Sequence, residues 1–237
     1  MIDSHCHILP GIDDGSKDMA QSLEMARIAV SDGIKTIVAT PHIHLGRFDN
    51  DLNSINAALS EFKEALKQND IPLEICLGAE VHIDPEVMML IANGLIPFVG
   101  EQDGLKVMLL EFPFTHIPAG SDKFVAWLKQ KGIKAMIVHP ERNREIRENI
   151  NKLQPFIQQD CLIQVTSSSI LGTFGPEPKA CVEELLNYDW VTLIASDAHN
   201  AKSRPPKLAE ARQAAALIVG EEASWKLVRD NPAKYLR

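Results

Sequence analysis

Residues 132–142 read GIKAMIVHPER, a short apolar run that begins after a glycine and ends on a histidine. The run is continuous instead of alternating, which is typical of parallel strands buried on both faces. Within this segment the strand-like run covers 133–138, and similar runs are a short N-terminal apolar start before His5 and residues 35–40, 73–79, 107–111, 161–165 and 190–195. Helical patterns between and after them cover 19–32, 51–69, 85–93, 120–131, 151–159, 177–187, 206–219 and 221–229. This alternation of about seven βα units predicts an α/β fold with a central parallel sheet.

Imidazoles and carboxylates follow the carboxyl ends of most of these strands. They are His5 and His7, then Asp14, His42, Glu80, Glu111 and His139, and finally Asp197 and His199. Only a barrel brings so many strand ends around one point, and that end carries the active site of barrel enzymes. Because the strands number one fewer than the usual eight, we expect a distorted, TIM-like (β/α)7 barrel that forms one domain over residues 1–237.

Composition narrows the class of protein. The 237 residues are 45% hydrophobic and carry a formal charge of −8, so a nucleic-acid partner is not expected. No run approaches the ~18 apolar residues of a membrane span, so membrane insertion is not expected either. The N-terminus lacks the pattern of a signal peptide, which favours a cytoplasmic protein. The helical face of residues 17–32 makes an oligomer possible.

The pattern His-x-His at positions 5 and 7 places both imidazoles on one face of a strand. Taken alone, the pair is explained equally well by hydrogen bonding, and Asp14 alone is explained better by a turn. The spacing repeats, however, as Asp197-x-His199. Mixed imidazole and carboxylate ligands suit Mn²⁺, Fe or Zn²⁺, and the share of carboxylates favours Mn²⁺ or Fe.

Two arginines lie near these positions and are candidates for binding a phosphate ester. Arg142 is three residues past His139, and Arg204 is five residues past His199. A guanidinium matches phosphate oxygens in bidentate fashion, although pairing with Glu141 or Glu145 is the alternative for Arg142. No cysteine has an arginine six positions on, and Gly-x-Ser-x-Gly is absent. Hydrolysis would therefore use metal-activated water, and the hypothesis is attack by a hydroxide that bridges two metal ions.

Several segments in combination resemble the PHP (polymerase and histidinol phosphatase) superfamily. They are His5-x-His7, Thr40-Pro41-His42, Glu80, Glu111, His139-Pro140-Glu141-Arg142 and Ser196-Asp197-x-His199. Residues 4–15, SHCHILPGIDDG, are similar to the opening of the bacterial manganese-dependent tyrosine phosphatases of capsule and exopolysaccharide synthesis.

The resemblance implies a distorted (β/α)7 barrel with three divalent metal ions, with Mn²⁺ favoured over Fe or Zn²⁺. It implies a first metal held by His5, His7, Glu80 and Asp197, a second by Glu80, Glu111 and His139, and a third by Asp14, His42 and His199. It assigns phosphate contacts to Arg142 and Arg204. The implied partner is a phosphotyrosine-containing protein, the tyrosine-rich tail of a bacterial tyrosine kinase.

Three alternatives stay open at this stage. The same site is suited to a small phosphomonoester such as histidinol phosphate. A metal-dependent amidohydrolase also uses His-x-His, but Glu80 and Glu111 stand where a carbamylated lysine is common. A non-catalytic module that binds metal or phosphotyrosine is the third.

Other histidines and aromatic residues receive weaker expectations. His82 and His116 are expected to be loop or surface residues, and His44 is a candidate to line a pocket. Core packing is expected for Phe98, Phe112, Phe114 and Phe174, with contact to an aromatic substrate as the alternative.

Overall fold

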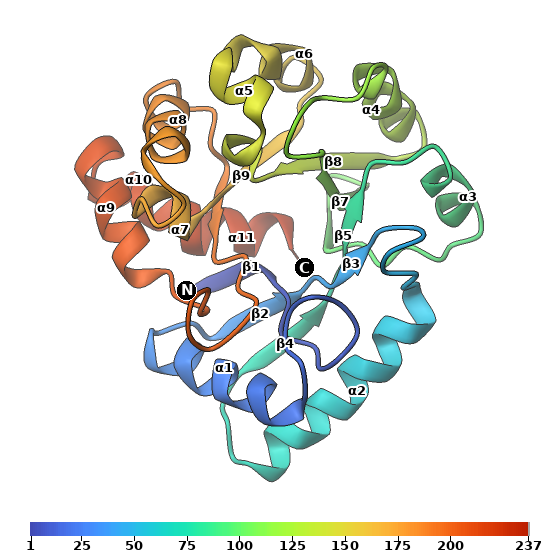
Figure 1. Ribbon diagram of the computed structural model, residues 1–237, viewed down its shortest axis with the longest axis vertical. Coiled ribbons are helices and arrows are strands. Elements are labelled where there is room, and N and C mark those ends of the chain that lie inside the picture. Colours follow the sequence, from blue (N-terminus) through green and yellow to red (C-terminus); the bar gives the residue numbers. More distant parts are fainter. Residues whose placement is uncertain (237) are drawn as a thin grey trace.

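The computed structural model describes residues 1–236, with parallel strands around the centre and helices outside them (Figure 1). The strands are β1 (Ile2–Cys6), β2 (Thr36–Ala39), β3 (His42–Ile43), β4 (Glu74–Leu77), β5 (Glu80–His82), β6 (Gly100–Gln102), β7 (Leu105–Glu111), β8 (Ile133–Val138), β9 (Leu162–Thr166) and β10 (Leu193–Ala195). The α-helices are α1 (Met19–Ser31), α2 (Leu52–Gln68), α3 (Val87–Ala92), α4 (Ser121–Gln130), α5 (Arg144–Glu148), α6 (Gln154–Ile157), α7 (Ser167–Ile170), α8 (Pro176–Asn187), α9 (Ala209–Val219), α10 (Glu221–Trp225) and α11 (Asn231–Tyr235).

The predicted strands over 35–40 and 73–79 correspond to β2 and β4, and each is followed after a short break by a further strand, β3 or β5, that was not predicted and belongs to another sheet. One sheet has the order β1-β2-β4 and the other β10-β9-β8-β7-β5-β3, with β6 antiparallel to β7. Pro41 lies between β2 and β3 and has no N–H to donate to a ladder. Gly78 lies between β4 and β5, where a Cβ atom would come within 2.6 Å of Val99 Cγ1. The chain therefore changes sheet at positions that cannot continue a regular strand.

The two sheets are joined again on the side of β1. The amide of His7 donates to Ala198 O at 2.8 Å, and the amide of Asp197 donates to His5 O at 2.9 Å. These bonds link the first strand to the loop after β10, so the strands form a barrel-like ring. The predicted distorted TIM-like (β/α)7 fold is confirmed, and the breaks and cross-links are its distortion.

The apolar core has two parts. A small cluster fills the inside of the ring, with Val107, Leu109 and Met136 from neighbouring strands and Leu236 from the C-terminal end. A larger cluster packs the outer faces of the strands against the helices, for example through Phe62 of α2 and Leu128 of α4. Each such side chain contributes about 1.5–3 kcal/mol when fully buried. The core therefore holds the strand ends, and the side chains that follow them, in place.

Side-chain caps mark the start of α1, α2 and α5, and the predicted bounds of three helices were wrong. The helix predicted over 221–229 is α10 followed by a π-helical turn, Lys226–Asp230. The predicted helix over 151–159 is a 3₁₀ turn followed by the short α6, in which Pro155 occupies the first turn. The predicted helix over 206–219 begins only at Ala209, after two prolines. There the carboxylate of Asp32 accepts the amides of Leu208 and Ala209 at 2.6 and 3.0 Å. Among the described residues, no helix is long and apolar enough to cross a membrane.

Candidate metal centre

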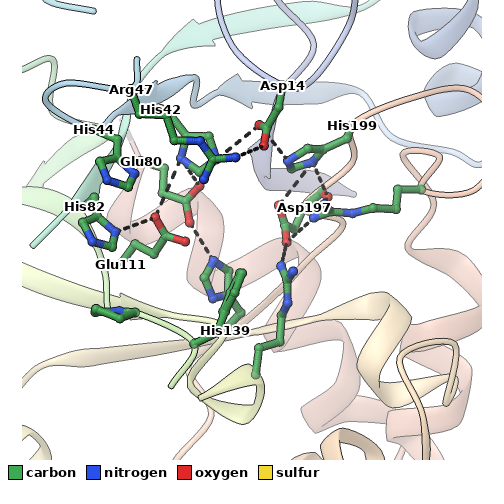
Figure 2. Close-up of a pocket in the computed structure, with 14 residues that line it drawn as sticks. Asp14, His42, His44, Arg47, Glu80, His82, Glu111, His139, Asp197 and His199 are labelled. Atoms are coloured by element: carbon green, nitrogen blue, oxygen red, sulfur yellow. Dashed lines mark hydrogen bonds and ion pairs between the residues drawn. The ribbon is translucent and has the colours of Figure 1, made fainter. Parts of the chain in front are cut away.

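A cavity of about 220 Å³ opens at the carboxyl ends of the strands (Figure 2). Its lining residues are Asp14, His42, His44, Arg47, Glu80, His82, Glu111, Pro113, Phe114, His139, Arg142, Asp197, His199 and Arg204. The backbone at two of the strand ends is unusual, because His139 and Asp197 have positive φ angles of 35° and 50°. Left-handed backbone is uncommon outside glycine and clusters at functional sites. It turns each of these side chains into the cavity directly after its strand.

Four donor atoms meet behind this cavity, and they belong to the residues expected to hold a first metal. His5 Nε2 and His7 Nε2 lie 3.1 Å apart. Glu80 Oε2 is 3.3 and 3.2 Å from these two nitrogens, and Asp197 Oδ1 is 3.6 and 3.5 Å from them. Ligands placed 2.0–2.2 Å from one tetrahedral cation stand about 3.4 Å apart. The donor atoms of His5, His7 and Glu80 therefore have the spacing of a metal site, and Asp197 approaches it from the side of the two imidazoles.

A second group of donors lies at the edge of the cavity. Asp14 Oδ1 is 3.4 Å from both His42 Nε2 and His199 Nε2, and Figure 2 shows the three side chains turned toward one another. Asp14 is the most exposed of the three, with 41% of its side chain accessible. These are the residues expected to hold a third metal, and their donor atoms lie within 4.8 Å of one another together with a donor atom of His7, which the expected set did not include.

The remaining group differs from the expected set of Glu80, Glu111 and His139. The donor atoms of His42, Glu80 and Glu111 lie within 4.8 Å of one another, and His139 is outside that group. His139 Nε2 instead contacts Glu80 Oε1 at 2.6 Å. Glu80 thus stands between the groups, with one oxygen toward His5 and His7 and the other toward His139. All three predicted ligands meet at the cavity, while their roles as ligands stay predictions.

The prediction that His82 is an ordinary loop or surface residue was wrong. His82 ends β5, and its Nδ1 lies 3.2 Å from Glu111 Oε2. Its ring stacks on that of His44, with ring centroids 4.0 Å apart and planes 4° apart. The expectation that His44 lines a pocket is confirmed. His82 was not identified because the predicted strand ended at residue 79, whereas in the structure a further strand, β5, ends at His82.

The electrostatics of the cluster favour a bound cation. Glu80 Oε2 and His42 Nδ1 are buried and make no hydrogen bond to any described residue. Burial alone would raise the pKa of Glu80, but His5, His42 and His139 hold it well below its usual range. The same holds for Asp197, where Arg204 and His5 outweigh burial and hold the carboxyl pKa low. Ionised carboxylates inside a protein are costly unless they are paired or coordinate a metal, so these residues fit divalent cations.

Both arginines predicted to contact phosphate meet at Asp197. Arg142 Nη1 and Arg204 Nη2 donate to Asp197 Oδ2 at 2.7 and 2.6 Å. The alternative that the arginines pair with an acid is thus met by Asp197, and not by Glu141 or Glu145. Asp197 therefore points one oxygen at the paired imidazoles and the other at the two guanidinium groups. This places a positively charged wall beside the donor groups, as an anionic substrate requires.

Three supporting residues were not found from the sequence. His7 Nδ1 donates to Asp13 Oδ2 at 2.7 Å, and the amide of Gln164 faces His5 Nδ1 at 3.3 Å. Arg147 Nη1 donates to the backbone oxygen of Arg142 at 2.6 Å. Partners of this kind orient ligand side chains and select the histidine tautomer. Asp13 carried a weak signal, as one of two adjacent aspartates, whereas Gln164 lies inside a strand without any signal.

A barrel-like α/β fold with clustered imidazoles and carboxylates at its strand ends defines a metal-dependent hydrolase. The family model described as capsular polysaccharide synthesis, CpsB/CapC, matches residues 1–237. The chain belongs to this family, which confirms the resemblance inferred from the motifs.

Two comparisons describe the near relatives. The chain is 39% identical to the tyrosine-protein phosphatase YwqE of Bacillus subtilis (strain 168) over 97% of this chain and 89% of the relative. It also superposes with a TM-score of 0.91, at 38% identity, on a structure from crystallographic work on YwqE and on CpsB from Streptococcus pneumoniae, both metal-dependent tyrosine phosphatases. That match covers 99% of this chain and 94% of the other.

The histidinol phosphate phosphatase of Lactococcus lactis is a far more distant match. Its TM-score is 0.55 at 13% identity, over 94% of this chain and 93% of the other. This likeness concerns the fold alone.

Proposed function

We propose that residues 1–237 form one metal-dependent phosphatase domain that hydrolyses phosphotyrosine in a protein substrate. The observation that carries the proposal is the meeting of the donor groups and both arginines around one cavity. A phosphoric monoester has the negative charge that such a site attracts. Membership in the family of YwqE and CpsB supports a phosphotyrosine substrate over histidinol phosphate.

Three divalent ions, with Mn²⁺ favoured over Fe or Zn²⁺, are proposed as the cofactors. His5, His7, Glu80 and Asp197 would hold the first, Glu80, Glu111 and His139 the second, and Asp14, His42 and His199 the third. Bound divalent metal lowers the pKa of water toward ~7 and polarises phosphoryl oxygens. The share of carboxylate donors in these sets, four of nine residues, supports Mn²⁺ or Fe.

The chain's own residues account for binding of the phosphoryl group and for departure of the phenol. Arg142 and Arg204 are about one-fifth exposed, and both guanidinium groups reach the cavity. They are placed to hold the phosphoryl oxygens and to stabilise the charge that develops on them. The leaving phenol has a pKa of about 10, so it departs with little help from a proton donor.

The proposed partner is a bacterial tyrosine kinase with a phosphorylated tyrosine-rich tail. The family description, capsular polysaccharide synthesis, supports a kinase that controls polysaccharide synthesis or export. Hydrolysis of its phosphotyrosines would oppose the kinase.

The test compares turnover of a phosphotyrosine peptide with turnover of histidinol phosphate, in Mn²⁺ and after chelation. Release of phosphate from the peptide that depends on Mn²⁺ and exceeds release from histidinol phosphate is expected. Preference for histidinol phosphate would leave the assignment of the site unchanged but would make the protein an enzyme of small-molecule metabolism. No turnover of either substrate by metal-loaded protein would overturn the proposal.

A further inference from the structure

One wall of the cavity differs in chemistry from all the others. Of the described residues that line it, only Pro113 and Phe114 present apolar side chains. Both lie in the loop that follows Glu111 at the end of β7. Phe114 is 47% exposed, whereas core packing was expected for it, so that expectation was wrong. An exposed aromatic ring beside a charged cavity is an unusual placement, because phenylalanine is among the residues most often buried.

The ring of Phe114 lies next to the groups that are placed to hold the phosphoryl oxygens. The Arg142 guanidinium carbon is 4.4 Å from the Phe114 ring centroid. The ring of His139 is 5.9 Å from Phe114, measured between centroids. A phosphoryl group held by Arg142 and Arg204 would therefore carry its ester oxygen, and the group attached to that oxygen, close to Phe114.

We propose that Pro113 and Phe114 form an aryl-binding subsite that contacts the phenyl ring of the phosphorylated tyrosine. The inference rests on the proposed phosphatase function and adds the residues that select aryl phosphates over alkyl phosphates. The remaining lining side chains are charged or imidazole groups, which an apolar ring contacts less favourably than it contacts phenylalanine. Pairing of two aromatic rings strengthens binding by up to about tenfold beyond the burial of area.

A second aromatic residue provides a matched comparison. The Phe174 ring centroid is 4.9 Å from the Arg142 guanidinium carbon and 5.7 Å from that of Arg204. Phe174 therefore supports the same arginines without lining the cavity. If Phe114 acted only by positioning Arg142, its removal would weaken every phosphoryl ligand equally, as removal of Phe174 is expected to do.

The experiment is calorimetric binding of phenylphosphonate and methylphosphonate to Mn²⁺-loaded wild type, Phe114→Ala and Phe174→Ala, with metal content measured for each. These probes share the anion and differ in the ring, and neither is hydrolysed. Phe114→Ala should raise the Kd of phenylphosphonate about tenfold and leave that of methylphosphonate unchanged. Phe174→Ala should leave the ratio of the two Kd values at the wild-type level.

Two results would overturn the inference. Equal weakening of both probes by Phe114→Ala would make Phe114 a positioning residue for Arg142. An unchanged Kd for phenylphosphonate in Phe114→Ala would show that the ring binds elsewhere. Because the readout is binding, failure of the subsite is distinct from failure of the proposed phosphatase function, which is tested by turnover of the phosphotyrosine peptide.

Discussion

Replacement of Asp13 by asparagine tests whether a residue outside the predicted ligand set controls metal binding. The Asp13 carboxylate accepts three donors: His7 Nδ1 at 2.7 Å, the Gly15 amide at 2.9 Å and the His42 amide at 3.1 Å. Burial alone would raise the pKa of Asp13, but His7 holds it below its usual range, so the group is ionised near neutral pH. An ionised carboxylate keeps the proton of His7 on Nδ1 and leaves Nε2 free to bind a metal.

Asparagine has one oxygen and one NH₂ group, and the site requires acceptors on both sides. If the amide oxygen faces Gly15, the NH₂ group faces His7 and favours the tautomer with its proton on Nε2. If the oxygen faces His7, the NH₂ group meets the amide of Gly15. Either arrangement loses a hydrogen bond to a charged group, which contributes about 1.5–3 kcal/mol. Substitution of such outer partners typically weakens metal binding by about 10- to 100-fold, which is consistent with that loss.

The assay is calorimetric titration of Mn²⁺ into chelator-treated wild type, Asp13→Asn and Asp18→Asn. Asp18 is the control because it undergoes the same substitution in the same loop. It caps α1 by accepting the amide of Gln21 at 2.9 Å, and asparagine is an equally good cap. Asp13→Asn should bind Mn²⁺ about 10- to 100-fold more weakly, and Asp18→Asn should match wild type. Wild-type affinity in Asp13→Asn would refute the tautomer argument.

Three further predictions concern the ligand set and the arginines. Arg142→Ala should reduce turnover of a phosphotyrosine peptide about 100- to 1,000-fold. Its metal content should equal that of the wild type, because Arg204 still holds Asp197. Wild-type turnover would show that Arg142 does not act in the site. His5→Ala should lose about one metal ion per chain together with activity, and full metal occupancy by elemental analysis would disprove its role as a ligand. Mn²⁺ binding should release protons and become tighter as pH rises from about 6 to about 8. Burial alone would lower the pKa of His42 and His139, but their contacts with Glu80 raise it above the ordinary value of a histidine. A cation that binds these imidazoles must therefore displace protons. Calorimetry in two buffers that differ in ionisation enthalpy measures this release, and a pH-independent affinity without proton exchange would contradict it.

The βα alternation could be read from the sequence because each unit carries a local signal. Strand 133–138 was predicted with the bounds that the structure has, since an apolar run lies between Gly132 and His139. Helix α2 was predicted within a residue at each end, because Asp51 caps it locally through the amides of Asn53 and Ser54. The division of the ring into two sheets could not be predicted in this way. It depends on the pairing of β2 with β4 and of β3 with β5, strands that are distant in the sequence and meet only in the fold.

The candidate site likewise has features that the sequence predicts and features that only the folded structure reveals. Imidazoles and carboxylates at strand ends stood out because a buried charge without a partner is costly, so their positions and their meeting at one cavity were predictable. The contact of Arg142 with Asp197 was not, because the two residues follow different strands, β8 and β10. Arg204 lies in the same loop as Asp197, and its contact depends on how that loop folds back on itself. Phe114 was misjudged for a related reason, since hydrophobicity alone favours burial and gives no information about a cavity wall.

Short stretches of the sequence thus predict the helices, most of the strands and the kind of functional site. The reason is that capping, apolar runs and the spacing of ligands each involve only a few neighbouring positions. The partners of each functional group depended on the folded chain. The contact of His7 with Asp13 spans only six positions, but it depends on how the loop between the two residues folds. Which oxygen of Asp197 faces Arg142, and which ring is left exposed, follow from distances between segments far apart in the sequence. Such distances are set by packing of the whole barrel, because every strand end is positioned by its neighbours and by the helices behind it.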